Sequence, residues 1–346
     1  MNIEKYVINF AQCVVPVDVN TIAILSFKEN FSIKGVNMSA AVENILKNFN
    51  TPAVLEEVAQ LLSSKYSTAT LKKLLDFLVE KSVLIKECDS KESLAYDKAF
   101  LEKTFFYTKS GKSLQKIVDE LTQLRIGIMG TSQLVRGLLD ELSKSRLLTN
   151  FYVGALNEEI DLNLEANGVS ISKYPLHADF SYGQKIVDDS DIIVVAYNYF
   201  DHYFFNQVNE MCFKANKKWL RVVVNGSNAE IGPLFIPGET CCYSCLQARL
   251  FKNTTGKERV FEDLYADKEF HERSKNGAIE FSSMYPLLSI ASGMASSEIM
   301  KHLTGMECNL ENEVLMVDCL DFSVEKAYIF KDYMCKICVH KDVVLI

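Results

Sequence analysis

Four cysteines in two widely separated pairs have the spacing of a metal site. Cys242 and Cys245 form the first pair, Cys335 and Cys338 form the second, and each pair encloses two residues. Two such knuckles supply four thiolates, which bind zinc tetrahedrally and leave no coordination position open for catalysis. The sequence therefore predicts a structural Zn²⁺ that ties the end of the chain to a much earlier loop within one domain.

The alternatives to zinc are ordinary buried thiols and disulfides. Free cysteine packs as a small buried hydrophobe, which is how we interpret the remaining ones: Cys13, Cys88, Cys212, Cys241, Cys308 and Cys319. Disulfides are disfavoured because Met1–Asn20 interrupts its apolar residues with Glu4 and Asp18, so we expect no secretory signal. Thiols are then expected to stay reduced, in a cytoplasmic protein.

Composition bounds the class of protein. The chain has 346 residues, of which 48% are hydrophobic and 24% charged, enough for a small domain and a medium one. Its net charge of -8 argues against a general nucleic-acid binder, because phosphates require a basic face. It contains no apolar run of about 18 residues, so we expect no membrane span.

The first 88 residues read as a small α+β module. Two alternating segments, Thr21–Phe27 and Asn30–Gly35, predict a hairpin of short strands. Three helical patterns follow, starting near Ser39, Thr51 and Ser67. A closing strand is expected at Val83–Lys86. This order predicts a winged-helix-like module over residues 1–88, in which an exposed strand edge beside a helix can accept an extended peptide.

The rest of the chain predicts a second, larger domain. Residues 89–119 are polar and charged and read as a connector. From residue 120 to 346 strands alternate with helices, which predicts a Rossmann-like α/β domain with a mostly parallel sheet. The expected elements begin with the strand Arg125–Met129, a turn at Gly130 and the helix Ser132–Ser143; later strands are Phe151–Ala155, Asp191–Ala196 and Trp219–Asn225, and later helices Asn206–Ala215 and Pro286–Leu303.

A long motif then carries a family resemblance. The motif consists of Gly232-Pro233, Pro237-Gly238, Thr240 and the first cysteine pair. An expected helix of small residues and the second cysteine pair follow it. With the strand, glycine turn and helix before it, this order resembles the ThiF/MoeB family of the ubiquitin-activating superfamily. The module and domain together are similar to MccB-type enzymes of microcin C biosynthesis, and more so to ThiF-like partner proteins of thiazole/oxazole-modified microcin (YcaO) clusters.

The resemblance implies binding of a ribosomally made precursor peptide. In these families the leader lies between the outer strand and the last helix of the N-terminal module. The corresponding residues here are Ile22, Ile24, Phe27, Phe31, Ile33, Leu74 and Leu78. The leucine stripe of the last helix can equally be core packing. The resemblance also implies homodimerisation through the ThiF-like domain.

The nucleotide site of the family is largely missing from this sequence. Working members hold ATP with four glycines after the first strand, whereas this chain keeps only Gly130. The strand ending near Ala155 lacks the acidic residue that binds ribose, and the phosphate-binding Asn-x-x-Arg-Gln segment is absent. What remains for ATP and magnesium is a degenerate set: Gly130, Thr131, Ser132, Arg136 and Asp201. Thr131 or Ser132 can instead be a simple helix N-cap.

These departures lead to a first functional hypothesis. The chain is expected to be a leader-binding subunit that recruits a precursor for bacteriocin biosynthesis, with a YcaO-type cyclodehydratase as the partner that forms azoline rings. The alternative is an MccB-like enzyme that uses ATP to activate a carboxyl or amide group. A plain structural or regulatory winged-helix protein is the third class. No catalytic residue is predicted, because His202, His271, His302 and His340 show no partner pattern.

Overall fold

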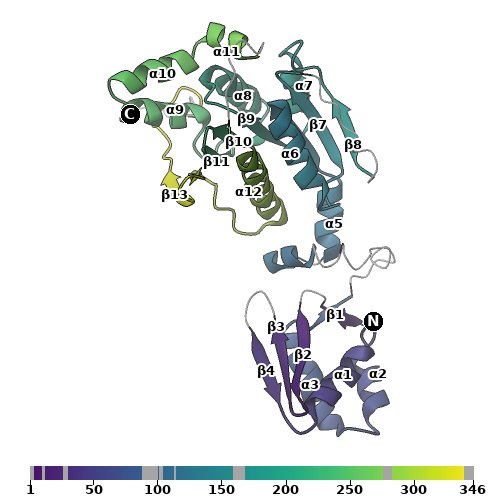
Figure 1. Cartoon of the computed structure of the whole chain (residues 1–346). Helices are drawn as coiled ribbons and strands as arrows, with labels where there is room; N and C mark the ends of the chain where they lie inside the picture. The colour runs from purple at the N-terminus through teal and green to yellow at the C-terminus, as the bar shows by residue number, and fades with distance from the viewer. Residues whose placement is uncertain are drawn as a thin grey trace, which may run out of the picture. The chain divides into compact units, whose positions relative to one another are not determined.

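The chain folds as two compact units, residues 1–117 and 118–346 (Figure 1). The computed structural model describes residues 4–9, 12–25, 30–87, 100, 104–112, 114–158, 168–275 and 283–338. Parts of the expected connector, residues 89–119, thus lie outside the described residues. The three-part division at residues 88 and 119 stays a prediction.

Within the described residues, the small unit contains strands β1 to β5, helices α1 to α3, the 3-10 helix η2 (Phe105–Ser110) and the start of α5 (Leu114–Thr122). Strand β1 pairs antiparallel with β5, and β2, β3 and β4 form a separate antiparallel sheet in that order. Helices α1 to α3 lie between β4 and β5 in the chain. The bounds are β1 Tyr6–Ile8, β2 Cys13–Asp18, β3 Thr21–Leu25, β4 Phe31–Lys34, α1 Met38–Lys47, α2 Leu55–Leu62, α3 Thr68–Glu80 and β5 Leu84–Lys86.

The core of the small unit lies between its sheet and its helices. The expected leucine stripe of α3 is buried, and Ile22 and Ile24 of β3 pack into the same cluster without any exposed surface. The predicted β3–β4 hairpin is confirmed, with Ile22 opposite Ile33. The helix starts were less accurate. Ser67 is the N-cap of α3, but α1 starts after Asn37, and Ser39 instead donates its hydroxyl to the Thr21 carbonyl at 3.0 Å.

The large unit is built on an eight-stranded sheet among the described residues, with the order β13-β12-β11-β10-β9-β6-β7-β8. The strands from β8 to β10 are parallel neighbours, whereas β11, β12 and β13 are antiparallel to theirs. The predicted mostly parallel, Rossmann-like α/β sheet is therefore confirmed. The strand bounds are β6 Arg125–Gly130, β7 Asn150–Ala155, β8 Ser170–Lys173, β9 Ile192–Tyr197, β10 Lys218–Asn225, β11 Asn228–Phe235, β12 Glu313–Asp318 and β13 Ser323–Tyr328.

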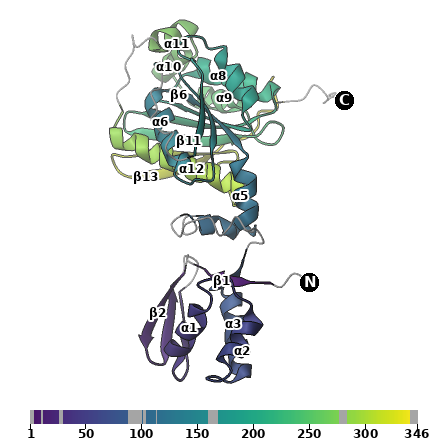
Figure 2. The same cartoon turned by 90° about the vertical axis from the view of Figure 1, so that its right-hand side faces the viewer.

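Helices cover both faces of this sheet (Figure 2). Helices α6 and α12 pack together on one face, where Gly137 of α6 meets Ser292 of α12. Helices α7 and α8 pack on the other, against a cluster that includes Met129, Ile193 and Val195. The bounds of the helices of the large unit are α6 Ser132–Ser143, α7 Tyr182–Asp189, α8 His202–Lys214, α9 Tyr243–Asn253, α10 Lys257–Tyr265, α11 Lys268–Lys275 and α12 Tyr285–Thr304.

Two motif glycines are required by the backbone. Gly130 ends β6 with φ 146°, and a Cβ there would lie 1.6 Å from the Ala196 carbonyl oxygen of β9. Gly232 in β11 has φ 100°, and a Cβ would lie 2.5 Å from the Glu313 carbonyl oxygen of β12. Residues other than glycine rarely adopt such φ values. Gly130 therefore has a structural reason to be kept even without a nucleotide.

Gly130→Ala is expected to destabilise the large unit, because the added methyl group collides with backbone that cannot rotate away. We expect a loss of about 1–3 kcal/mol, the range for overpacked sites, measured from the urea midpoint. Gly293→Ala in α12 is the control, because a Cβ at that helical glycine meets no atom within 4 Å. It should leave stability unchanged or raise it by up to about 1 kcal/mol. Equal stability of the Gly130 variant and the wild type would contradict this account.

Candidate functional site

The four predicted metal ligands lie together in the large unit. Their sulfur atoms are 3.8 Å apart for Cys242 and Cys245, 3.4 Å for Cys242 and Cys335, and 3.3 Å for Cys245 and Cys338. All four sulfurs lie within 4.8 Å of one another, and all four residues are buried. Sulfurs around Zn²⁺ at about 2.3 Å form a tetrahedron with edges of about 3.8 Å. The donor set and its spacing fit a structural zinc ion.

Local hydrogen bonds shape both cysteine pairs. Cys242 is the N-cap of α9, and the backbone N–H of Cys245 donates to its carbonyl at 3.0 Å. In the second pair, Cys335 N–H donates to the Asp332 carbonyl at 2.9 Å. The Asp332 N–H in turn donates to the sulfur of Cys245 at 3.3 Å. A hydrogen bond donated to a sulfur atom, as at Cys245, favours the thiolate form of cysteine, which is the form that binds metal.

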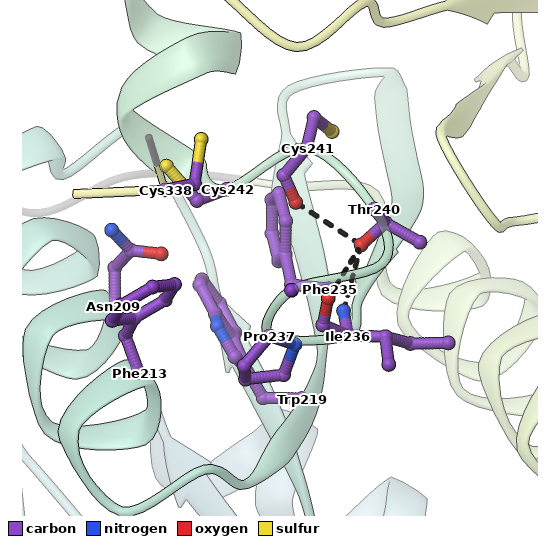
Figure 3. A pocket seen from close by; sticks show the side chains of 11 residues that line it. Asn209, Phe213, Trp219, Phe235, Ile236, Pro237, Thr240, Cys241, Cys242 and Cys338 are labelled. Atoms are coloured by element: carbon purple, nitrogen blue, oxygen red, sulfur yellow. Dashed lines mark hydrogen bonds between the residues drawn. The ribbon is translucent and has the colours of Figure 1, made fainter. Parts of the chain in front are cut away.

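The motif before the first pair forms a buried loop beside this cluster (Figure 3). The hydroxyl oxygen of Thr240 accepts the N–H of Ile236 at 2.7 Å and lies 3.1 Å from the Cys241 carbonyl. The N–H of Cys241 donates to the Asn312 side chain at 2.7 Å. Cys241 is buried but is not a member of the four-sulfur cluster. The motif therefore serves to place the first cysteine pair.

The degenerate nucleotide loop is filled by groups of the chain itself. Thr131 is the N-cap of α6, as the simpler interpretation predicted, although its side chain makes no capping bond. The N–H of Ser132 donates to Asn157 Oδ1 at 2.9 Å, and its hydroxyl donates to the Glu158 carboxylate. Arg136 lies one turn on, 3.8 Å from the same carboxylate. The half-exposed Glu158 carboxylate therefore lies beside the start of α6, which is where a phosphate would bind.

Asn157 and Glu158 were not identified from the sequence as members of this site. They follow β7 directly, at the parallel-strand edge that faces the start of α6. The strand itself ends without the acidic residue that binds ribose in the family. The available signal was the acidic residue just past the strand end. Its role differs from the expected one, because it pairs with α6.

Asp201, the residue predicted to remain from the magnesium site of the family, is fully buried, and both of its carboxylate oxygens have partners. Its Oδ1 accepts the Phe204 N–H at 2.8 Å, which caps α8. Its Oδ2 lies 2.6 Å from His271 Nδ1 and accepts the Tyr199 hydroxyl at 3.2 Å. Burial, with the nearby Tyr197 and Asp201, raises the pKa of Tyr199 far above its ordinary value, so this hydroxyl stays protonated and donates. Both oxygens of Asp201 are therefore used by the fold.

The histidines agree with the ordinary packed interpretation where the structure describes them. His202 is fully buried, with Nδ1 2.7 Å from the Tyr243 hydroxyl and Nε2 2.7 Å from Glu262. His271 pairs with Asp201 as above. Burial first, and then the charge of Lys218, lowers the pKa of His302. His340 lies outside the described residues. His202 and His271 thus hold α10 and α11 against α8.

The predicted peptide-binding residues separate into two groups. Ile22, Ile24, Leu74 and Leu78 belong to the buried core of the small unit and offer little or no surface to a peptide. On β4, by contrast, Phe31 and Ile33 are half-buried. Phe27 lies outside the described residues.

A half-buried aromatic group beside β4 was missed by the sequence reasoning. Phe31 meets Phe77 of α3 edge to face, with ring centroids 5.9 Å apart. The ammonium group of Lys81 lies 5.9 Å from each of these two rings. Phe77 lies within the leucine stripe, directly before Leu78, and an aromatic residue among these leucines was the available signal. The outer strand and last helix of the small unit therefore share one surface.

With the fold and the cysteine cluster described, the class of protein can be stated. A model of the ThiF family matches residues 159–337, which is more than half of the chain. The chain belongs to the ThiF family. No curated protein matches it.

Several solved structures share the whole fold. MccB of E. coli is 15% identical with a TM-score of 0.67, and the match covers 97% of each chain. A heterocyclase in complex with substrate and cofactor is 16% identical with a TM-score of 0.63, and the heterocyclase TruD is 17% identical with a TM-score of 0.63. The matches cover 97% of this chain but only 39% and 43% of those two. At these identities the likeness establishes the fold.

Within the described part of the chain, no helix is both long and apolar enough to cross a bilayer.

Cys245→Ser is expected to release the metal and lower the melting temperature, because structural zinc contributes folding free energy directly. Elemental analysis should give one zinc per wild-type chain and well under one in the variant. Cys241→Ser is the matched control, since this cysteine is equally buried in the same loop but is not a ligand. Wild-type protein with no zinc, purified without chelators, would contradict the metal assignment.

Titration calorimetry with ATP and magnesium is expected to show no saturable binding to the isolated protein, because Glu158 occupies the start of α6 and Asp201 is used within the fold. No pyrophosphate should be released when precursor peptide is added. Micromolar binding, about -8 kcal/mol at that affinity, would overturn this expectation and favour an ATP-dependent enzyme.

Proposed function

We propose that this chain is the precursor-recruiting subunit of a peptide-modifying complex. Its small unit would bind the leader of a ribosomally made peptide as an added strand on β4, and a partner enzyme would carry out the chemistry. The free edge of β4 beside α3 is the observation that carries this proposal. Within the described residues, β4 pairs with β3 alone.

The side chains of β4 suit peptide capture. Phe31 and Ile33 are half-buried while Ser32 and Lys34 point to solvent. A peptide added to this edge would gain main-chain hydrogen bonds from the strand, and its alternate side chains would contact the surface formed with α3. The ammonium group of Lys81 beside the rings there favours a leader that carries an acidic residue near an apolar one.

The opposite edge of the same sheet is poorly suited to strand addition. Strand β2 contains Pro16, which has no N–H to donate, and its pairing with β3 shifts register between Pro16 and Asp18. Proline and register irregularities are the usual means of protecting a sheet edge from further pairing. These features leave β4 as the better edge for an added strand.

The filled nucleotide loop supports recruitment over catalysis. Glu158 and Asn157 satisfy the start of α6, and Asp201 is committed to α8, His271 and Tyr199. The alternative is an MccB-like enzyme that activates a carboxyl or amide group with ATP. The full-length match to MccB supports that alternative, and structures of MccB with MccA peptide are among those that share the fold. ATP binding separates the two functions.

The proposed partner is a YcaO-type cyclodehydratase, which would use ATP to turn Cys, Ser or Thr of the precursor into azoline rings. The two heterocyclases that share the fold are more than twice as long as the matched part, and one of them was solved with its substrate. The likeness of this chain to part of two heterocyclases supports a role in the same kind of peptide modification.

Homodimerisation through the large unit also stays a prediction. Its best support is a group of exposed apolar side chains on and around the edge strand β13: Leu320, Phe322, Val324, Tyr328, Phe330, Tyr333 and Met334. Isolated exposed hydrophobic residues are normal, but such a concentration favours a protein interface.

Phe31→Ala is expected to weaken leader binding at least tenfold, about 1.4 kcal/mol, because it removes the aromatic surface between β4 and α3. The probe is a labelled synthetic leader of a candidate precursor, chosen among short reading frames that neighbour this gene, and binding to the full chain is followed by fluorescence anisotropy. Val17→Ala on β2, the opposite edge, is the control and should bind as the wild type does. Equal weakening by both variants, or by neither, would place recognition elsewhere.

A further inference from the structure

We infer that Asn209 of α8 is a positioning residue for the four-cysteine metal site. Its Oδ1 accepts the backbone N–H of Tyr243 at 3.0 Å, and Tyr243 is the residue directly after the ligand Cys242. Asn209 itself is 1% exposed. The bond joins a helix outside the cysteine motif to the first turn of α9. This inference rests on the zinc assignment proposed for the cluster.

The bond matters because of what the start of α9 contributes. The first backbone N–H groups of a helix have no partner within the helix, and the N-terminus carries a partial positive charge. Cys242 caps α9, and Cys245 lies in its first turn. Four thiolates outweigh the charge of one Zn²⁺, so the cluster is negative and is stabilised by this helix end. By fixing the Tyr243 N–H, Asn209 holds both cysteines of the first pair in place.

The amide nitrogen of Asn209 is buried as well. This Nδ2 atom has no hydrogen-bond partner in the described part of the chain. Asn209 lines a cavity together with two of the ligands, Cys242 and Cys338 (Figure 3). The cavity is small, with room for about one water molecule. The Nδ2 donor is therefore available to a water molecule bound in this cavity.

The test compares Asn209→Ala with Asn206→Ala in the full-length metal-loaded protein. Asn206 lies one turn earlier on α8 and also bonds α9, through Gln247 at 3.0 Å, one turn beyond Tyr243 and not at a backbone N–H of the first turn. We expect zinc transfer to a chromogenic chelator to become at least tenfold faster in Asn209→Ala and to stay at the wild-type rate in Asn206→Ala. The visible spectrum of the cobalt-substituted protein, which reports tetrahedral thiolate geometry, should change only in Asn209→Ala.

A second variant separates the hydrogen bond from side-chain volume. Asn209→Leu keeps a side chain of similar size but offers no acceptor to the Tyr243 N–H, so it should speed zinc release and change the cobalt spectrum even in the case that Asn209→Ala fails to fold. Wild-type spectra and release rates in Asn209→Ala, equal effects of Asn206→Ala, or a wild-type cobalt spectrum in Asn209→Leu would each overturn the inference. The zinc content of the wild type is measured alongside, so failure of the metal assignment is distinguished from failure of the Asn209 role.

Discussion

The sulfur cluster is the contact on which the large unit most depends. It joins the start of α9 to the segment that follows β13, so two parts of the chain with the whole of α10 to β13 between them are fixed at one point. The antiparallel strands β11, β12 and β13 extend the parallel sheet on this side. Around the cluster the Thr240 loop and Asn312 pack against the same corner. Without the cluster, the residues after β13 would be held mainly by the buried Ile329 side chain and the ion pair between Lys252 and Asp332.

A second constraint acts where the parallel strands end. In a sheet of this type ligands bind at the carboxyl ends of the strands, next to helix N-termini. Here the residues after β7 and β9 turn back onto the protein. The carboxylate of Glu158 reaches α6, and that of Asp201 caps α8 and meets His271. Each carboxylate lies at the N-terminal end of a helix, whose partial positive charge it compensates. These contacts are the physical basis for proposing that the chain keeps the fold of the family without binding a nucleotide.

Much of the fold was predictable because its signals are local. The bounds of α6 follow from Gly130, the cap at Thr131 and an apolar stripe, and the spacing of Cys242 and Cys245 determined the metal site. Strand β2 was missed because its residues do not alternate and Pro16 argues against a strand. The burial of Ile22 and Ile24, the pairing of Phe31 with Phe77 and the bond from Asn209 to Tyr243 depend on residues brought together from distant elements. No local pattern contains that information.

The central claim is that this protein binds a peptide at β4 and no nucleotide at α6. Hydrogen–deuterium exchange on the full chain tests both parts in one measurement, with the leader peptide and ATP-magnesium added separately. The account predicts that the leader slows exchange at residues 30–34 and 77–81, and that ATP-magnesium leaves residues 130–136 unchanged. Protection of residues 130–136 by ATP, with no protection of β4 by the leader, would contradict it.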